Sequence, residues 1–114
     1  MQIENLSKRL REFANDRDWD QFHAPKNLSM ALMVEAAELA EHFQWMSEQQ
    51  SLELSDDKLK EVSYELADVF IYCVRLSDKL GVDLPKVVDE KIMINEKKYP
   101  AEIVRGSSKK YTEY

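Results

Sequence analysis

Four acidic residues of this chain form two pairs with the same spacing. Glu35 and Glu38 are three residues apart, as are Glu65 and Asp68. Residues three apart on an α-helix share a face, so each pair directs two carboxylates the same way. Apolar residues flank both pairs, and a buried carboxylate is costly unless it is paired or bound to a metal. If the two helices pack side by side, the four carboxylates converge and repel one another unless a cation binds. A dense set of oxygen ligands suits Mg²⁺ or Mn²⁺, and Mg²⁺ is often shared with substrate phosphates.

Two other interpretations of the acidic residues compete with a metal site for phosphate chemistry. Acidic pairs at this spacing are common on solvated helix faces, and either pair alone would be read that way. A ferritin-like di-iron bundle also uses helical carboxylates, but it needs Glu-x-x-His. His42 stands four residues after Glu38 and seven after Glu35, so that motif is absent.

The elements that position these acids are helices. Apolar residues recur at steps of three and four, and two glycines and three prolines in 114 residues are too few for a many-turned β domain. The second helix follows Pro25 with Asn27 as its cap, and His42 and Trp45 continue its acidic stripe. The expected helices are residues 3–17, 25–46, 55–80 and 85–99, with a loop at 18–25 and a polar connection at 47–57.

The third expected helix carries two patterns at once. Ser55 and two aspartates mark its start, and Gly81 marks its end. Along one face run Glu61, Glu65, Asp68, Tyr72, Arg75 and Lys79, which we call the acidic-to-basic stripe. The run 69–74 is apolar on every side of the helix. A helix that is apolar all round is buried all round, so we expect a subunit interface here.

Composition and charge argue against several classes of protein. A net charge of −6 argues against an electrostatic nucleic-acid binder, and a single cysteine rules out an intrachain disulfide. The N-terminus lacks a signal-peptide pattern, and no stretch approaches the length of a spanning helix. We therefore predict a soluble, cytoplasmic protein with no membrane partner. The chain reads as one domain over residues 1–100, followed by a basic tail or flap over the site at 101–114.

Further candidate side chains lie outside the two acidic pairs. On the fourth helix Lys91, Asn95 and Lys98 share a face, which is either solvated or placed to hold phosphate and sugar. Aromatic residues that could stack on a base are Trp19, Trp45 and Tyr72, although tryptophan in a small helical protein is more often core.

These motifs together resemble a known family. Glu35-Ala-Ala-Glu38 with Phe43-Gln-Trp45, followed by Glu65-Leu-Ala-Asp68, is similar to the E-x-x-E and E-x-x-D signature of MazG-like all-α nucleoside triphosphate pyrophosphohydrolases. A third block, Lys91 through Asn95 to Tyr99, matches as well. The loop from Arg17 through Trp19 to His23, and the tail from Arg105 to Tyr111, resemble the dCTP pyrophosphatase branch. At position 10 this chain has leucine, whereas a related member of the branch has histidine. The difference bears on which base the protein selects.

The resemblance implies a four-helix bundle that assembles as a dimer or a dimer of dimers. It implies Mg²⁺-dependent cleavage of a nucleoside triphosphate to the monophosphate and pyrophosphate, with dCTP or a modified dCTP favoured. It also implies that Glu35, Glu38, Glu65 and Asp68 are metal ligands. Of these, Glu38 is the candidate general base. The substrate contacts that the resemblance implies are Trp19, Trp45, Tyr72, Lys91, Asn95, Tyr99, Lys110 and Tyr111. His23 is a further candidate substrate contact, although a hydrogen-bonding role within its loop is the more usual one.

Three functions therefore remain to be separated. The first is the dCTP-directed hydrolase. The second is a broad house-cleaning or dUTP-directed enzyme with the same chemistry. The third is a non-catalytic helical dimerisation module, which would explain the apolar helix without any metal.

Overall fold

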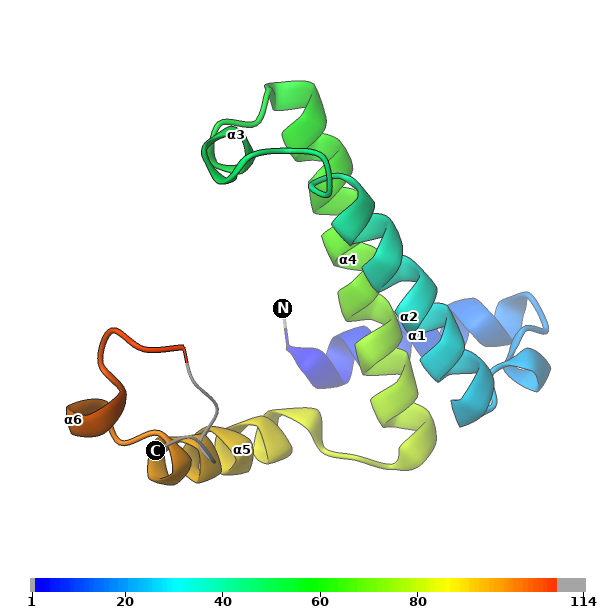
Figure 1. Ribbon diagram of the computed structural model, residues 1–114. Coiled ribbons are helices and arrows are strands. Elements are labelled where there is room, and N and C mark those ends of the chain that lie inside the picture. Colours follow the sequence, from blue (N-terminus) through cyan, green and yellow to red (C-terminus); the bar gives the residue numbers. More distant parts are fainter. Residues whose placement is uncertain (1, 109–114) are drawn as a thin grey trace. The chain divides into compact units, whose positions relative to one another are not determined.

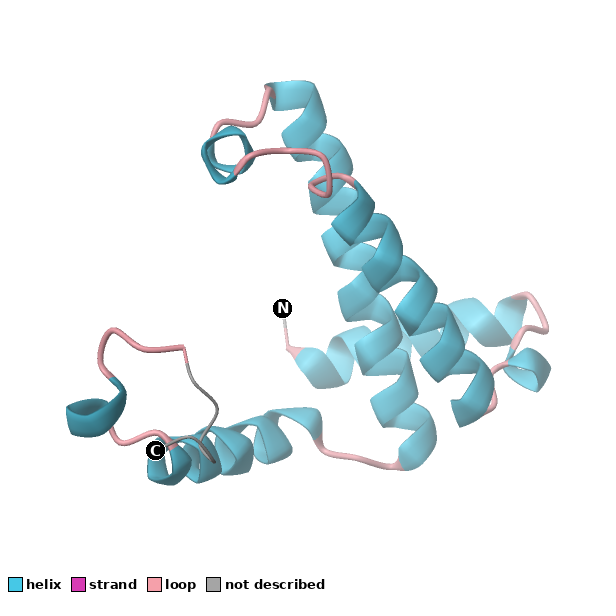
Figure 2. Ribbon diagram, viewed as in Figure 1, coloured by secondary structure: helices cyan, strands magenta, loops and turns pink. Residues whose placement is uncertain are grey.

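The computed structural model describes residues 2–108, and within them every regular element is helical (Figure 2). Four long helices correspond to the four expected ones. Three short ones lie between or after them. In chain order they are α1 (Ile3–Asp16), η1 (Asp20–Phe22), α2 (Pro25–Glu41), α3 (Glu48–Leu52), α4 (Asp56–Leu80), α5 (Leu84–Lys98) and α6 (Ala101–Val104). The predicted all-α class is confirmed.

The ends of α4 follow the local chemistry of its sequence. The Ser55 hydroxyl accepts a hydrogen bond from the Lys58 backbone N–H, and two aspartates occupy the first turn. Gly81 ends the helix in the left-handed conformation, with φ 68°. Only glycine adopts that conformation without steric cost, so the chain stops the helix where the sequence predicted.

The start and end of α2 differ from the expectation. Pro25 occupies the first helical turn with Ala24 as the N-cap, so Asn27 lies inside the helix and donates to the Phe22 carbonyl oxygen. The helix ends at Glu41 rather than near Met46, and His42 caps it.

A competing helix start explains why α2 stops early. Ser47 and Gln50 form a reciprocal capping box that begins α3, a helix missing from the expected polar connection. The residues just before Ser47 form turns, closed by hydrogen bonds such as Phe43 N–H to Ala40 C=O. Trp45 therefore lies beyond the helix, and the prediction that it continues the acidic stripe is wrong.

Residues up to Val82 form one compact unit, and residues from Asp83 onward form another. In the first unit α2 lies along α4, and α1 also packs against α4 (Figure 1). The second unit holds α5 and α6, of which α6 lies in the expected tail. The predicted division of the chain at residue 100 stays a prediction.

Many large apolar side chains of this fold are exposed to solvent. Among residues 2–108 the buried apolar side chains are Ala14, Leu28, Val62 and Val74. Within this single chain the apolar run 69–74 of α4 is not buried all round, because Phe70 is 46% exposed. None of the described helices is long and apolar enough to cross a bilayer.

Candidate functional site

The packing of α2 against α4 brings the acidic pairs together. Glu35, Glu38 and Glu65 each offer a carboxylate oxygen, and these three oxygens lie within 4.8 Å of one another. Asp68 is not part of this close group, although its charge acts on Glu35. All four side chains are partly buried. The structure thus gathers three of the four predicted ligands, with the fourth one turn away on the same face of α4.

The cluster is electrostatically unsatisfied. Within residues 2–108, two buried side-chain oxygens have no hydrogen-bond partner, and both belong to it: Oε2 of Glu35 and Oε2 of Glu65. The pKa of Glu35 is raised from 4.5 to about 7, first by burial and then by the Glu38 carboxylate, with Asp68 and Glu65 adding to the effect. A group of carboxylates this close repels itself unless protons or a cation intervene.

A divalent cation suits this donor set. Every donor is a carboxylate oxygen, which hard cations such as Mg²⁺ and Mn²⁺ prefer, and two of the oxygens are buried without a protein donor. The cluster can therefore hold a metal ion.

Tyr72 extends the cluster along α4. It lies one turn after Asp68, is partly buried, and its pKa is raised by burial and then by the charges of Glu35 and Asp68. The phenol therefore stays protonated beside the carboxylates and keeps a hydroxyl group that can donate a hydrogen bond.

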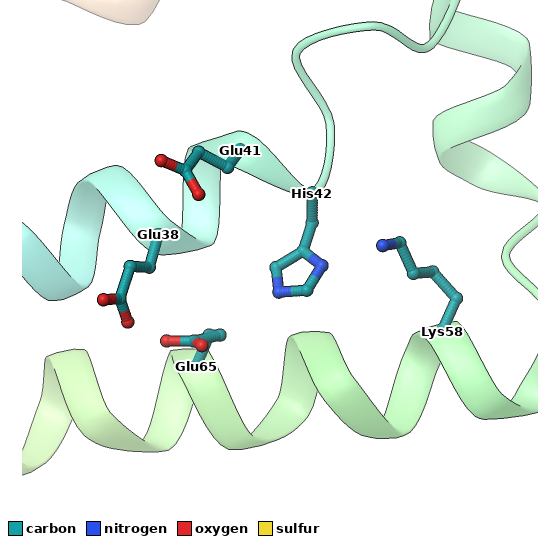
Figure 3. Close-up of a pocket in the computed structure, with 5 residues that line it drawn as sticks. All are labelled: Glu38, Glu41, His42, Lys58 and Glu65. Atoms are coloured by element: carbon teal, nitrogen blue, oxygen red, sulfur yellow. The ribbon is translucent and has the colours of Figure 1, made fainter.

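A pocket of about 430 Å³ opens at the other side of the cluster. Its lining comes from the end of α2 and the first half of α4, and Figure 3 shows Glu38 and Glu65 pointing toward one another from the two helices. The residues that line the pocket are Glu38, Glu41, His42, Lys58 and Glu65.

The sequence interpretation missed part of this pocket. The sequence patterns assign no function to Lys58 or His42, yet both line the pocket. The Nδ1 atom of His42 lies 4.0 Å from Glu61, and Lys58 Nζ lies 3.6 Å from the same carboxylate. A signal was available, since Lys58 precedes Glu65 by seven residues, which is two helical turns.

A second polar cluster surrounds Arg75, further along the acidic-to-basic stripe. Arg75 is 3% exposed and donates to Asp78 on α4 and to Asp20 and His23 in the loop between α1 and α2. Lys79 also donates to Asp20. His23, a predicted substrate contact, is therefore held by an arginine of α4.

The two tryptophans occupy different surroundings. Trp19 packs edge-on against Phe13 with ring centroids 5.8 Å apart, and it is 47% exposed. Trp45 is 89% exposed in the turns after α2. Their predicted role in holding a base stays a prediction.

The remaining predicted substrate contacts fall elsewhere. Lys91 and Asn95 are exposed on α5, and Tyr99 caps that helix. These three belong to the second unit, so their part in the site stays a prediction. Lys110 and Tyr111 lie outside the described residues.

Residues 30–114 match the MazG-like family. The chain belongs to that family. Its match begins just before the first acidic pair and includes both pairs, so the carboxylate cluster lies within the MazG-like region.

Individual MazG-like relatives cover nearly the whole chain. It is 44% identical over 113 residues to dCTP pyrophosphatase 1 of Homo sapiens, and 42% identical over 113 residues to dCTP pyrophosphatase 1 of Rattus norvegicus. Each match covers 97% of this chain and 66% of the relative, so the chain spans a little under two thirds of those proteins.

A solved structure supports the MazG-like fold. The crystal structure of a pyrophosphatase from Archaeoglobus fulgidus superposes with a TM-score of 0.80 at 41% identity, covering 85% of this chain and 91% of that one. The all-α MazG-like helical domain predicted from the motifs is therefore confirmed.

Proposed function

We propose that this protein is a Mg²⁺-dependent nucleoside triphosphate pyrophosphohydrolase. Its favoured substrate is dCTP or a modified dCTP, which it cleaves to the monophosphate and pyrophosphate. One observation carries the proposal: the two acidic pairs of a MazG-like chain converge and leave two buried carboxylate oxygens without partners. The names of the human and rat relatives favour dCTP.

The proposed metal ligands are Glu35, Glu38, Glu65 and Asp68. Mg²⁺ is the favoured ion and Mn²⁺ the alternative, because both take oxygen ligands. When bound, the metal would neutralise phosphate charge and lower the pKa of a bound water. Without it the four carboxylates would repel a triphosphate.

Glu38 is the proposed general base. It belongs to the close group of oxygens and also lines the pocket, so it borders both the cluster and an open volume. In the reaction, the water oxygen bonds to the α-phosphorus as the bond to the bridging oxygen breaks. The water proton passes to Glu38 and the electron pair leaves with pyrophosphate.

Substrate binding is assigned to aromatic, amide and basic side chains. The charges of Glu35 and Asp68 act on Tyr72, which places it beside the carboxylates, and its hydroxyl suits the sugar or base. The proposed base and sugar contacts are Trp19, His23, Trp45, Tyr72 and Asn95, and the proposed phosphate contacts are Lys91, Tyr99, Lys110 and Tyr111.

Self-association is part of the proposal. Leu59, Leu66 and Phe70 form an exposed apolar stripe on α4, and Met30, Met33 and Val34 form one on α2. Exposed apolar residues in such number are typical of subunit interfaces. We propose that it is covered in a homodimer, or in a dimer of dimers.

A nucleotide panel tests the activity. Purified protein, Mg²⁺ and a set of canonical and modified triphosphates are assayed for release of pyrophosphate and, separately, of phosphate. We expect pyrophosphate, with dCTP or a modified dCTP hydrolysed fastest, and we expect Glu38→Gln to lose the Mg²⁺-dependent turnover.

Other outcomes of the panel would point to the rival functions. Comparable rates on purine and pyrimidine triphosphates would indicate a broad house-cleaning enzyme, and a preference for dUTP would indicate the dUTP-directed one. No turnover, together with melting curves unchanged by Mg²⁺ and every nucleotide, would indicate the dimerisation module.

A further inference from the structure

Arg75 is the only charged side chain that is fully buried within residues 2–108. A buried arginine is costly unless its donors are satisfied, and here they are. Its Nη2 donates to Asp20 at 2.6 Å, its Nη1 to Asp78 at 3.1 Å, and its Nε to His23 Nδ1 at 3.1 Å. Two of these three partners belong to the loop between α1 and α2, more than 50 residues away in sequence.

The contact with Arg75 determines the state of His23. Arginine carries only donors and remains protonated, so Nδ1 of His23 must accept the hydrogen bond. The imidazole is then neutral with its proton on Nε2. Burial and then the positive charge of Arg75 lower the pKa of His23 below its ordinary value, which favours the same neutral form. His23 therefore keeps one N–H donor, at Nε2.

Both acidic partners of Arg75 are shared with other cations. Asp20 also accepts from Lys79 at 3.0 Å, and Asp78 also accepts from Arg11 of α1 at 2.6 Å. The first contact ties the loop a second time to α4. The second ties α1 to α4 and touches no loop residue. The two functions of the cluster, holding the loop and holding α1, therefore use different side chains.

The position of Arg75 links this loop to the carboxylates. Arg75 follows Asp68 by seven residues and Tyr72 by three, so all three share the face of α4 that carries the acidic-to-basic stripe. One face of α4 thus carries Glu65 and Asp68 of the carboxylate cluster together with Arg75, which contacts Asp20 and His23 of the loop. A fixed relation between the reacting phosphates and a base-binding loop would follow from this arrangement.

We propose that Arg75 is a positioning residue, which holds residues 19–23 in place and presents the Nε2–H of His23 to an acceptor on the nucleotide base or sugar. The inference rests on the proposed function, because it needs a nucleotide as the ligand. Arg75 itself does not touch the substrate; it acts through His23 and through the loop that carries Trp19.

Two variants separate positioning from a role in stability alone. Arg75→Lys keeps a positive charge but loses the Nε donor, so it releases His23. Asp20→Asn removes one of the two carboxylates beside Arg75 and leaves Asp78 paired with the buried guanidinium group, so it weakens the loop contact without leaving Arg75 unpaired. Arg11→Gln is the matched control, because it removes an ion pair to Asp78 and leaves the loop contacts in place.

The first measurement is the tautomer of His23 by ¹⁵N NMR of the imidazole nitrogens. The chain has two histidines, and a His42→Gln variant assigns the signals. In the wild-type protein at pH 7 we expect His23 to be neutral with the proton on Nε2. In Arg75→Lys we expect a mixture of tautomers and a higher pKa, whereas Arg11→Gln should match the wild type.

The second measurement is the split between KM and kcat for the best triphosphate. We expect Arg75→Lys and Asp20→Asn to raise KM by about tenfold or more while kcat changes by less than about threefold, since the carboxylates are untouched. Arg11→Gln should change neither. A wild-type His23 tautomer in Arg75→Lys, or an unchanged KM in both variants, would overturn the inference.

Failure of the proposed function would look different. In that case the wild-type protein would release no pyrophosphate from any triphosphate. Failure of the inference alone would appear as an active wild type whose KM is unchanged in both Arg75→Lys and Asp20→Asn, or as a wild-type His23 tautomer in Arg75→Lys.

Discussion

Replacing Glu35 with glutamine removes the most perturbed carboxylate of the cluster. In the wild-type protein the pKa of Glu35 rises from 4.5 to about 7 on folding. The folded state therefore holds this proton more tightly than the unfolded state. The contribution of Glu35 to stability is fully present below pH 4.5 and is lost as the pH rises to about 7. Metal-free protein should lose stability across that window, and Glu35→Gln should lose less.

The structure gives the size of this effect. A pKa rise from 4.5 to about 7 corresponds to roughly 3 kcal/mol of differential stability. Glu35 is only partly buried, so solvent screens part of its interaction with the other carboxylates. We therefore expect about 1–2 kcal/mol of the pH-dependent loss to disappear in the variant.

Urea unfolding between pH 4.5 and 8.5, at one protein concentration and with EDTA, measures this difference. Glu12→Gln, on the exposed side of α1, is the matched control and should keep the wild-type slope. Adding Mg²⁺ at pH 8 should stabilise the wild-type protein and stabilise Glu35→Gln much less, because a ligand of the metal has been removed. Parallel pH profiles for wild type and Glu35→Gln, or equal stabilisation by Mg²⁺, would refute the reasoning.

Three further changes probe other features. Asp68→Asn should lower Mg²⁺-dependent pyrophosphate release by about 10²-fold or more, and activity within a few-fold of wild type would remove Asp68 from the metal ligands. Phe70→Glu places a charge on the exposed apolar face of α4 and should shift the protein to monomers in analytical ultracentrifugation. An unchanged mass would show that the subunit interface does not include Phe70. Gly81→Ala should cost about 1 kcal/mol in thermal unfolding, from the positive φ alone, because no atom lies within 4 Å of the added Cβ.

The sequence was most informative where structure is local. The boundaries of α4 follow from the serine cap at Ser55 and the glycine at Gly81, and both are read directly from neighbouring residues. The spacing within each acidic pair also predicted that its two carboxylates share a helix face, so that the pairs converge if the two helices pack side by side. Glu35, Glu38 and Glu65 are brought together as that reasoning required.

The predictions for the end of α2 and for Trp45 are wrong because two local signals compete there. Apolar periodicity continues past Glu41, but the capping box at Ser47 and Gln50 starts a new helix and displaces Trp45 from the stripe. Periodicity alone gives no weight to such a cap, so it predicts an end of α2 near Met46 rather than at Glu41.

The cluster around Arg75 could not be predicted for a different reason. Its hydrogen bond to His23 joins residues 52 positions apart, and it depends on the path of the loop between α1 and α2. A single sequence specifies that Arg75 lies on the stripe. It does not specify which loop residue will meet the guanidinium group.

Because Asp68 and Arg75 share one face of α4, insertions and deletions between them have a predictable effect. An added residue between Asp68 and Arg75 would rotate everything after it by about 100° relative to the carboxylates. Asp68 would keep its place against α2 while Arg75 swung away from the loop. Length changes in this seven-residue interval should therefore be rejected by selection, whereas the connection that contains α3 can vary in length without altering the register of the site.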